Sequence, residues 1–474
     1  MSAYRRCRSA LGLALPLLVG ATQPGATPLP GEVPPGASAA AASSLPPPAE
    51  RDRLYPFYMP MQGLRAPAVT LRIRCDASRA AGREVYEGRG ADALYGRVEG
   101  GYEFVYEALD SAGKPCVYPF SPWMPQVVGA LDGTQYVFRS SIPGQRVVFR
   151  TDDDWATIDL RLFNLGRQRV HFEMRDVELD FPRAIQPKGA LNLEVTGTER
   201  PGLFTAVLRR TRIYGGKNGI FVPNGQIMLY VEDGDIAGNV GTNNDQEHTA
   251  YINGTLVSHF RRTRLHGQRA WQNMASGHQL KDKAYLRIYE DVTVSNVPDG
   301  STPSAMPLID ASAYGFTWSE GLRIERVRPA QAPRDALVDL RTDIRYGEPG
   351  NYPWSVLAGE GWHMPASPLA ALDTVYLSVF LNTTVESFRT EPYAFALRPQ
   401  GRAFGPDGAH VEGSEQAAPR EQRTVSLAFD TTGTIARVYA PEGWTYVDPD
   451  LPVQSQWVLD RSAFIRHALG LIGR

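Results

Sequence analysis

The chain has 474 residues, with 43% hydrophobic and 21% charged side chains, a balance typical of a soluble globular protein. Its formal net charge of −2 excludes the strongly basic field with which proteins bind nucleic acids or anionic membranes. Its 45 glycines and 37 prolines indicate many short strands separated by many turns.

The first residues have the pattern of a secretory signal. Three arginines within residues 5–8 precede a short apolar run over residues 10–19, and small residues surround Ala21. The run is far below the roughly 20 apolar residues that a membrane-spanning helix needs. We therefore expect a signal peptide over residues 1–21, cleaved near Ala21, and a periplasmic or secreted bacterial protein without a membrane span.

Two further segments precede the main repeat. Residues 22–50 are rich in Pro and Ala and have almost no large apolar side chains, which predicts a disordered linker. Residues 51–158 contain strand-like runs between Gly- and Pro-rich turns, which predicts an N-terminal β region. Without the signal, Cys75 and Cys116 remain, and an oxidising compartment favours a disulfide between them.

Short, half-apolar strands recur at a constant offset of 30 residues, over residues 219–222, 249–252 and 279–282. A fixed offset of this size is typical of a solenoid, and a β-sandwich would not predict it. We therefore expect an all-β protein with a parallel β-helix over residues 159–390. Asparagines such as Asn218 and Asn253 follow or begin these strands, where we expect sharp corners that tolerate left-handed geometry.

The last part of the chain, residues 391–474, alternates strand-like runs with loops and ends in a helical pattern. Phe464, Ile465 and Ala468 fall on one face of this short C-terminal helix. We expect that face to pack against an open end of the solenoid.

Two motifs lie one coil apart within the predicted solenoid. The first strand reads H-x-x-Y, and the second reads G-H-x-L-K followed by Asp-Lys-Ala. The residues concerned are His248, Tyr251, Gly277, His278, Leu280, Lys281, Asp282, Lys283 and Ala284. This pattern resembles the pectate-lyase-like superfamily of right-handed parallel β-helix proteins, and it is similar to secreted bacterial members with H-x-x-Y and then G-H-x-[IL]-K-S-R-A. The family's Ser-Arg is here Asp282-Lys283.

The 30-residue step brings distant side chains together. Lys281 follows Tyr251 by 30 residues and precedes Asp310 by 29, so all three should stack on one outer face. Neighbouring strands lie about 4.8 Å apart, so these groups could surround one sugar ring. Asp282 would then point inward, where a carboxylate needs hydrogen-bond partners.

Lysine usage draws attention to the same strand. The chain has only five lysines among 49 basic residues, and two of them, Lys281 and Lys283, are two positions apart. An ammonium group can lose its proton in a crowded or dry site, whereas a guanidinium group effectively cannot, so the pair suits proton abstraction. The alternative is a solvated Lys-Asp-Lys face without chemistry.

These observations favour a lyase that cleaves a uronate-containing polysaccharide by β-elimination. Lys281 would be the base, and Tyr251 or Lys283 the acid; the resemblance to alginate-lyase and chondroitinase-B-type β-helices implies the same base. An arginine or a Ca²⁺ ion would neutralise the substrate carboxylate. Calcium candidates are Asp245, Glu247 and Asp310; substrate-contact candidates are His248, His278, Gln279 and Asp310. We expect no other cofactor, and a monomer with an acidic polysaccharide as its partner.

Two alternatives stay open. A β-helix glycoside hydrolase would need converging carboxylates, for which the candidates are Asp233, Asp235, Asp245 and Asp310. A non-catalytic carbohydrate-binding or surface protein would instead use exposed rings as stacking platforms, for which the candidates are Tyr251, Trp271, Trp318, Trp354 and Trp362. The histidine spacings match no short zinc motif.

Overall fold

A computed structural model describes about half of the chain. The described residues are 67, 69–75, 101–119, 126–128, 132–163, 169–184, 188–196, 203–223, 227–237, 247–253, 255–267, 277–284, 286–295, 308–312, 316–325, 336–341, 376–386, 393–398, 425–433, 438–439, 445–447, 461, 464, 465 and 468. The predicted signal peptide and linker lie outside these residues.

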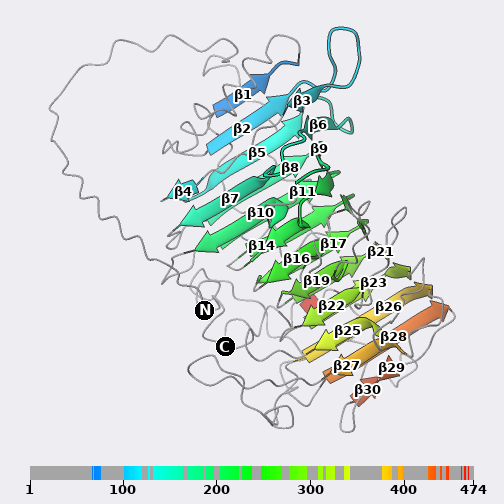
Figure 1. Ribbon diagram of the computed structural model, residues 1–474. Coiled ribbons are helices and arrows are strands. Elements are labelled where there is room, and N and C mark those ends of the chain that lie inside the picture. The colour runs from blue at the N-terminus through cyan, green and yellow to red at the C-terminus, as the bar shows by residue number, and fades with distance from the viewer. Residues whose placement is uncertain are drawn as a thin grey trace, which may run out of the picture.

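The described strands form a parallel β-solenoid whose coils stack along one axis, as Figure 1 shows. They belong to a 20-stranded sheet and a 10-stranded sheet. The pairings divide them into three ladders, and each coil contributes strands to them in turn. The prediction of an all-β parallel solenoid is confirmed.

The first ladder contains β1 (Val69–Ile73), β2 (Gly101–Tyr106), β5 (Thr134–Ser140), β8 (Arg169–Arg175), β11 (Leu203–Arg209), β14 (Ile227–Glu232), β17 (Val257–Arg261), β20 (Leu286–Glu290), β23 (Phe316–Glu320), β26 (Tyr376–Glu386), β28 (Val425–Gly433) and β30 (Thr445–Val447). The second ladder contains β3 (Val117–Pro119), β6 (Val147–Arg150), β9 (Val177–Phe181), β12 (Arg212–Gly215), β15 (Asp235–Ala237), β18 (Arg264–His266), β21 (Thr293–Ser295) and β24 (Arg323–Glu325). The third ladder, which is the 10-stranded sheet, contains β4 (Gln126–Val128), β7 (Ile158–Phe163), β10 (Gly189–Thr196), β13 (Asn218–Val222), β16 (Ala250–Asn253), β19 (Leu280–Lys283), β22 (Ile309–Ser312), β25 (Ala336–Arg341), β27 (Tyr393–Arg398) and β29 (Val438–Tyr439).

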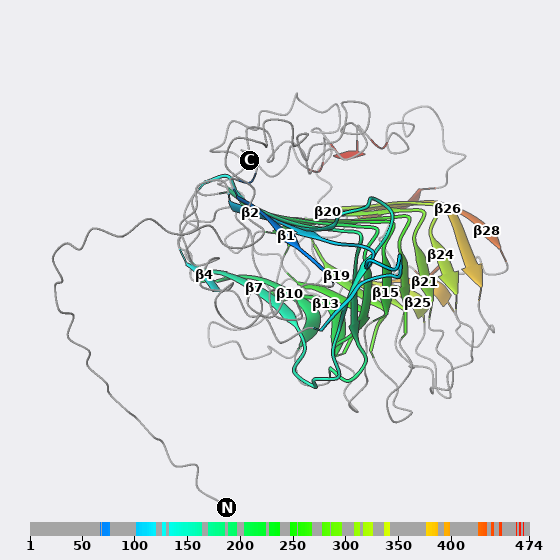
Figure 2. The ribbon, with the colours of Figure 1, turned by 90° about the horizontal axis from the view of Figure 1, so that it is seen from above.

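Figure 2 looks along the stack and shows these ladders as separate sides, with β2, β20 and β26 on one side, β7, β10 and β13 on another, and β15, β21 and β24 on a third. The first ladder begins before residue 159 and continues past residue 390, because β1, β2 and β5 precede β8 in it and β28 and β30 follow β26. Strands of both flanking regions therefore extend the same parallel ladders.

Alternate side chains of each strand fill the space between the ladders. On the third ladder Ile220, Ala250 and Leu280 occupy successive rungs and are fully buried. On the first ladder Phe104 and Phe138 stack with ring centroids 4.7 Å apart. Removing such rings from water stabilises the fold by about 2–3 kcal/mol per side chain.

The predicted disulfide is present near the start of the solenoid. Cys75 and Cys116 are bonded, with Cα atoms 5.7 Å apart and a sequence separation of 41 residues. Closing a loop of this length restricts the unfolded chain, which stabilises the folded state.

The corners with left-handed geometry differ from the sequence expectation. In each of five successive coils, one non-glycine residue between the first and second ladders has positive φ. These residues are Asp176, Arg210, Asp233, Arg262 and Asp291. Asn218 and Asn253 instead lie within strands, although their side-chain amides bond to backbone carbonyls as expected, those of Lys188 and Pro223.

The C-terminal helix is present, but it does not pack against an end of the solenoid as expected. Arg461, Phe464, Ile465 and Ala468 are helical, and the last three are buried. The Phe464 ring lies 5.9 Å from that of Phe316 and 5.4 Å from that of Trp318, both on β23. Trp318, expected as an exposed stacking ring, is therefore buried, because this helix packs on it. The helix therefore lies over a face of the first ladder (Figure 2), not over an end of the stack, because β26, β28 and β30 follow β23.

Among the described residues, none belongs to a helix long and apolar enough to span a membrane.

Candidate functional site

The predicted column of side chains is present on the third ladder. Phe221 pairs with Tyr251, Tyr251 with Lys281, and Lys281 with Asp310. The Phe221 and Tyr251 rings are 5.4 Å apart, and Lys281 Nζ lies 5.5 Å from the Tyr251 ring centroid. The predicted register is confirmed, and the part of this row from Phe221 to Asp310 is called the ledge below.

Asp310 connects the ledge to a buried histidine. Its Oδ2 lies 3.9 Å from Lys281 Nζ and 3.3 Å from His278 Nε2. The Asp310 and His278 side chains are 4% and 1% exposed, whereas that of Lys281 is 24% exposed. The Lys281 side chain is therefore partly open to solvent, whereas the Asp310 carboxylate that it contacts is enclosed.

His248 and His278 stack in successive coils behind the ledge, with ring centroids 5.2 Å apart. His248 Nδ1 accepts a hydrogen bond from the backbone N–H of His278, and the His248 ring lies 5.2 Å from that of Tyr251. Burial, together with the nearby charges of His278, Lys281 and Lys283, lowers the pKa of His248 well below its usual value. His248 is therefore a neutral ring at pH 7, with its hydrogen on Nε2.

Asp282 points inward, as the alternation of the strand predicts. The carboxylate is fully buried and accepts hydrogen bonds from the hydroxyls of Ser258 and Tyr289 and from the backbone N–H of Ala284. Asp282 stands where the family pattern has Ser, so this chain places a carboxylate in the core. The three donors satisfy that carboxylate.

The remaining predicted residues surround the ledge less directly. Gln279 is buried and its Oε1 accepts a hydrogen bond from the Thr249 hydroxyl. Lys283, on the rung after Asn253, is buried, in contrast to the more exposed Lys281. Glu247 is buried in the segment that precedes β16, next to His248, and Asp245 lies outside the described residues.

Calcium has no evident site in the part of the chain that the structure describes. There, no three His, Cys, Asp or Glu side chains are grouped as metal ligands would be. A Ca²⁺ ion takes six to eight oxygen ligands, and Glu247 and Asp310 alone do not supply them.

Of the carboxylates named for a hydrolase, the three that the structure describes do not converge, and Asp245 lies outside the described residues. Asp233 and Asp235 lie at the corner and on β15 of the second ladder, whereas Asp310 lies on β22 of the third. Asp233 is paired with Arg262 at 2.6 Å. Although burial opposes it, hydrogen bonds from His266 and Tyr214 lower the pKa of Asp235, so this carboxylate is ionised and unsuited to be a general acid.

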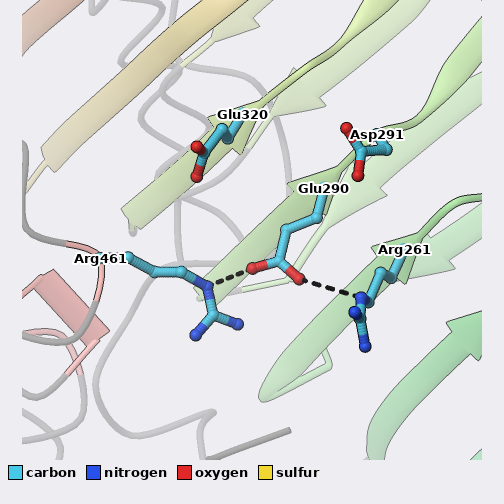
Figure 3. A pocket seen from close by; sticks show the side chains of 5 residues that line it. All are labelled: Arg261, Glu290, Asp291, Glu320 and Arg461. Carbon is cyan, nitrogen blue, oxygen red and sulfur yellow. Dashed lines mark ion pairs between the residues drawn. The ribbon is translucent and has the colours of Figure 1, made fainter. Parts of the chain in front are cut away.

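A cavity of about 400 Å³ on the opposite side of the solenoid is lined by Arg261, Glu290, Asp291, Glu320 and Arg461 (Figure 3). Glu290 lies between Arg461 and Arg261, and its Oε2 also lies 3.0 Å from His259 Nε2. Against the effect of burial, the contacts with His259, Arg461 and Arg261 lower the pKa of Glu290 to about 2. The charged residues of the cavity thus hold the C-terminal helix through ion pairs, and Glu290 is not suited to be a general acid.

Sequence reasoning missed two residues next to the ledge, Lys188 and Lys217. Lys188 Nζ lies 5.5 Å from the Phe221 ring centroid, on the side away from Tyr251. The signal was available, because four of the five lysines in the chain fall within residues 188–283.

Comparison of the chain with protein-family models, with curated proteins and with solved structures finds no match.

Proposed function

We propose that the protein is a secreted polysaccharide lyase that cleaves a uronate-containing polymer by β-elimination on the ledge. The observation that carries the proposal is the adjacency of Tyr251, Lys281 and Asp310 on one face of the third ladder. The half-buried phenol of Tyr251, the partly exposed side chain of Lys281 and the enclosed carboxylate of Asp310 lie one strand apart. They match, in that order, the acid, the base and the orienting group that this reaction needs.

In the proposed reaction, Lys281 in its amine form removes the proton from the carbon next to the uronate carboxylate. The electron pair forms a double bond and expels the 4-linked sugar oxygen, which takes the hydroxyl proton of Tyr251. The Lys281 ammonium then returns its proton to the Tyr251 phenolate, so both groups regain their starting states. Lys283 is the alternative acid, and the Asp310 carboxylate positions Lys281 Nζ.

The surroundings support a carbohydrate substrate. The Tyr251 ring is partly exposed and supported from behind by Phe221, and such a ring is suited to stack on a sugar. The Cys75–Cys116 disulfide agrees with an oxidising, extracytoplasmic location, which is where polymeric uronates are encountered.

The test is an absorbance assay on a panel of acidic polysaccharides, including pectate, alginate and chondroitin sulfate. Elimination creates a double bond conjugated to the carboxylate, which absorbs ultraviolet light, and hydrolysis does not. We expect the chromophore with one polymer class, and we expect Lys281→Ala to lower kcat about 10²- to 10⁴-fold because the base is lost.

Lys281→Arg separates the role of base from that of a cation. A guanidinium group keeps the charge but does not give up its proton, so we expect this variant to be as inactive as Lys281→Ala. Lys114→Ala, which removes a remote and exposed lysine, is the matched control with full activity. Reducing ends without a chromophore would favour a hydrolase, and full activity of Lys281→Ala would end the proposal.

A further inference from the structure

Lys188 and Lys217 occupy equivalent positions in neighbouring coils. Gly189 pairs with Asn218 on the third ladder, so the residues before them, Lys188 and Lys217, adjoin at the start of β10 and β13. Asn218 fixes this corner, because its backbone N–H and its side-chain amide both donate to the carbonyl of Lys188, at 2.9 and 2.5 Å. The two ammonium groups therefore extend from a rigid part of the backbone.

Neither lysine has a carboxylate partner in the part of the chain that the structure describes. There, Lys188 Nζ lies over the Phe221 ring. The arginines of the other ladders contrast with this, since Arg210, Arg212 and Arg262 are all in ion pairs. Cations that extend from neighbouring rungs repel each other when their charged groups approach, and an anion bound between them relieves that repulsion.

The lysine pair is continuous with the ledge. Lys188 Nζ, the Phe221 ring, the Tyr251 ring and Lys281 Nζ follow one another at 5.5, 5.4 and 5.5 Å. Phe221 is 7% exposed, so it supports the two flanking groups and does not itself stack on a ligand. Cationic groups therefore stand at both ends of one aromatic pair, roughly three strand spacings or about 14 Å apart.

We propose that Lys188 and Lys217 form a second anion-binding subsite, which holds an acidic group of a sugar unit further along the same polymer chain. The inference rests on the proposed function for its substrate class, and the acidic group is a carboxylate or a sulfate. The polymer would then run across the strands, along the solenoid axis, from Lys281 towards Lys188. A chain long enough to reach both ends would bind more tightly than a short one.

The test measures binding separately from turnover. The full-length protein is titrated, by calorimetry at low ionic strength, with pectate, alginate, chondroitin sulfate and neutral dextran, using Lys281→Ala as background so that no polymer is degraded. In that background we expect Lys188→Ala/Lys217→Ala to weaken binding of the preferred acidic polymer about tenfold and to reduce its dependence on salt. Lys114→Ala is the matched control, because it removes an exposed lysine elsewhere, and neutral dextran should not bind.

The outcomes separate the subsite from the lyase proposal. Lysine-dependent binding without a chromophore from the wild-type protein supports the subsite and overturns the lyase. A chromophore from the wild-type protein, together with unchanged polymer affinity after Lys188→Ala/Lys217→Ala, supports the lyase and overturns the subsite. Absence of binding to every acidic polymer also overturns the subsite. A preference for pectate and alginate assigns the anion as carboxylate, and a preference for chondroitin sulfate assigns it as sulfate.

Discussion

Asp282 shows how a single residue can contradict the hydrophobic pattern of a strand and still be satisfied. It lies between the outward-facing Lys281 and Lys283, so its carboxylate enters the core, where burial raises its pKa. The charge of Arg287 and the hydrogen bonds from Ser258 and Tyr289 oppose that shift. Asp282 therefore places a buried polar network in a row where the two preceding coils have the apolar residues Val222 and Ile252.

We predict that Asp282→Ala lowers the free energy of unfolding by about 2–3 kcal/mol, because the hydroxyls of Ser258 and Tyr289 lose their buried acceptor. Asp282→Asn keeps the size of the side chain and one acceptor oxygen, so its loss should be smaller. Denaturant unfolding of both variants and of the wild type at one pH measures this order. An alanine variant as stable as the wild type would contradict the network.

The raised pKa of Asp282 predicts how its contribution depends on pH. The folded protein binds this proton more tightly than the unfolded chain, so the contribution is complete below the usual pKa of 3.8 and is lost as the pH rises through the folded value. The stability of the wild type relative to Asp282→Asn should therefore fall as the pH rises above the usual pKa of 3.8. The same unfolding experiment at several pH values tests this, and a constant difference would refute it.

At the scale of elements, the corners between ladders determine where each strand begins. Arg210 and Asp176 are both at positive φ and are joined by an ion pair of 2.6 Å, and Arg262 and Asp233 repeat the arrangement. Left-handed backbone imposes a strain of about 1–2 kcal/mol on each such residue, and the stacked ion pairs offset part of it. Charge alternation from coil to coil thus takes the place that stacked asparagines were predicted to have.

Gly215, at the end of β12, has a stricter requirement than these corners. Its φ is +117°, and a Cβ atom there would lie 2.0 Å from the carbonyl oxygen of Phe181 on the neighbouring strand. We predict that Gly215→Ala lowers the free energy of unfolding by well above the roughly 1 kcal/mol that positive φ alone would cost, because the main chain of Phe181 must also move. Gly113→Ala is the matched control, since Gly113 also has positive φ, at +76°, but has open space around it. Equal thermal shifts for the two variants would contradict the steric argument.

At the scale of the whole molecule, the repeat could be predicted from the sequence, whereas the left-handed corners and the place of the C-terminal helix could not. The offsets from Tyr251 to Lys281 and from Lys281 to Asp310 predicted the ledge, because parallel coils convert a constant spacing into neighbouring positions. The left-handed corners could not be predicted, since ion pairs between coils, such as that of Arg210 with Asp176, stabilise a geometry that the single residues disfavour. The place of the C-terminal helix depends on contacts across more than 140 residues, for which the local pattern has no signal.

The helix over the first ladder leads to the last prediction. Phe464 is fully buried against Phe316 and Trp318, and one turn earlier Arg461 forms an ion pair with Glu290. Phe464→Ala should lower the free energy of unfolding by about 3–5 kcal/mol, because it leaves a cavity between the helix and the sheet. The tryptophan fluorescence of this variant should also shift to the red, because water reaches Trp318. The shift should be absent when the same substitution is made in a Trp318→Phe background.

Ile142→Ala is the control for Phe464→Ala, because Ile142 is 37% exposed and its truncation should alter neither stability nor fluorescence. The ledge lies on the third ladder, so Lys281 and its partners should keep their arrangement when the helix is loosened. We therefore expect Phe464→Ala to retain its kcat at temperatures where it is folded. Lost activity in a variant that is still folded would show that the helix acts on the ledge, whereas lost stability with intact activity would assign the helix to covering the sheet.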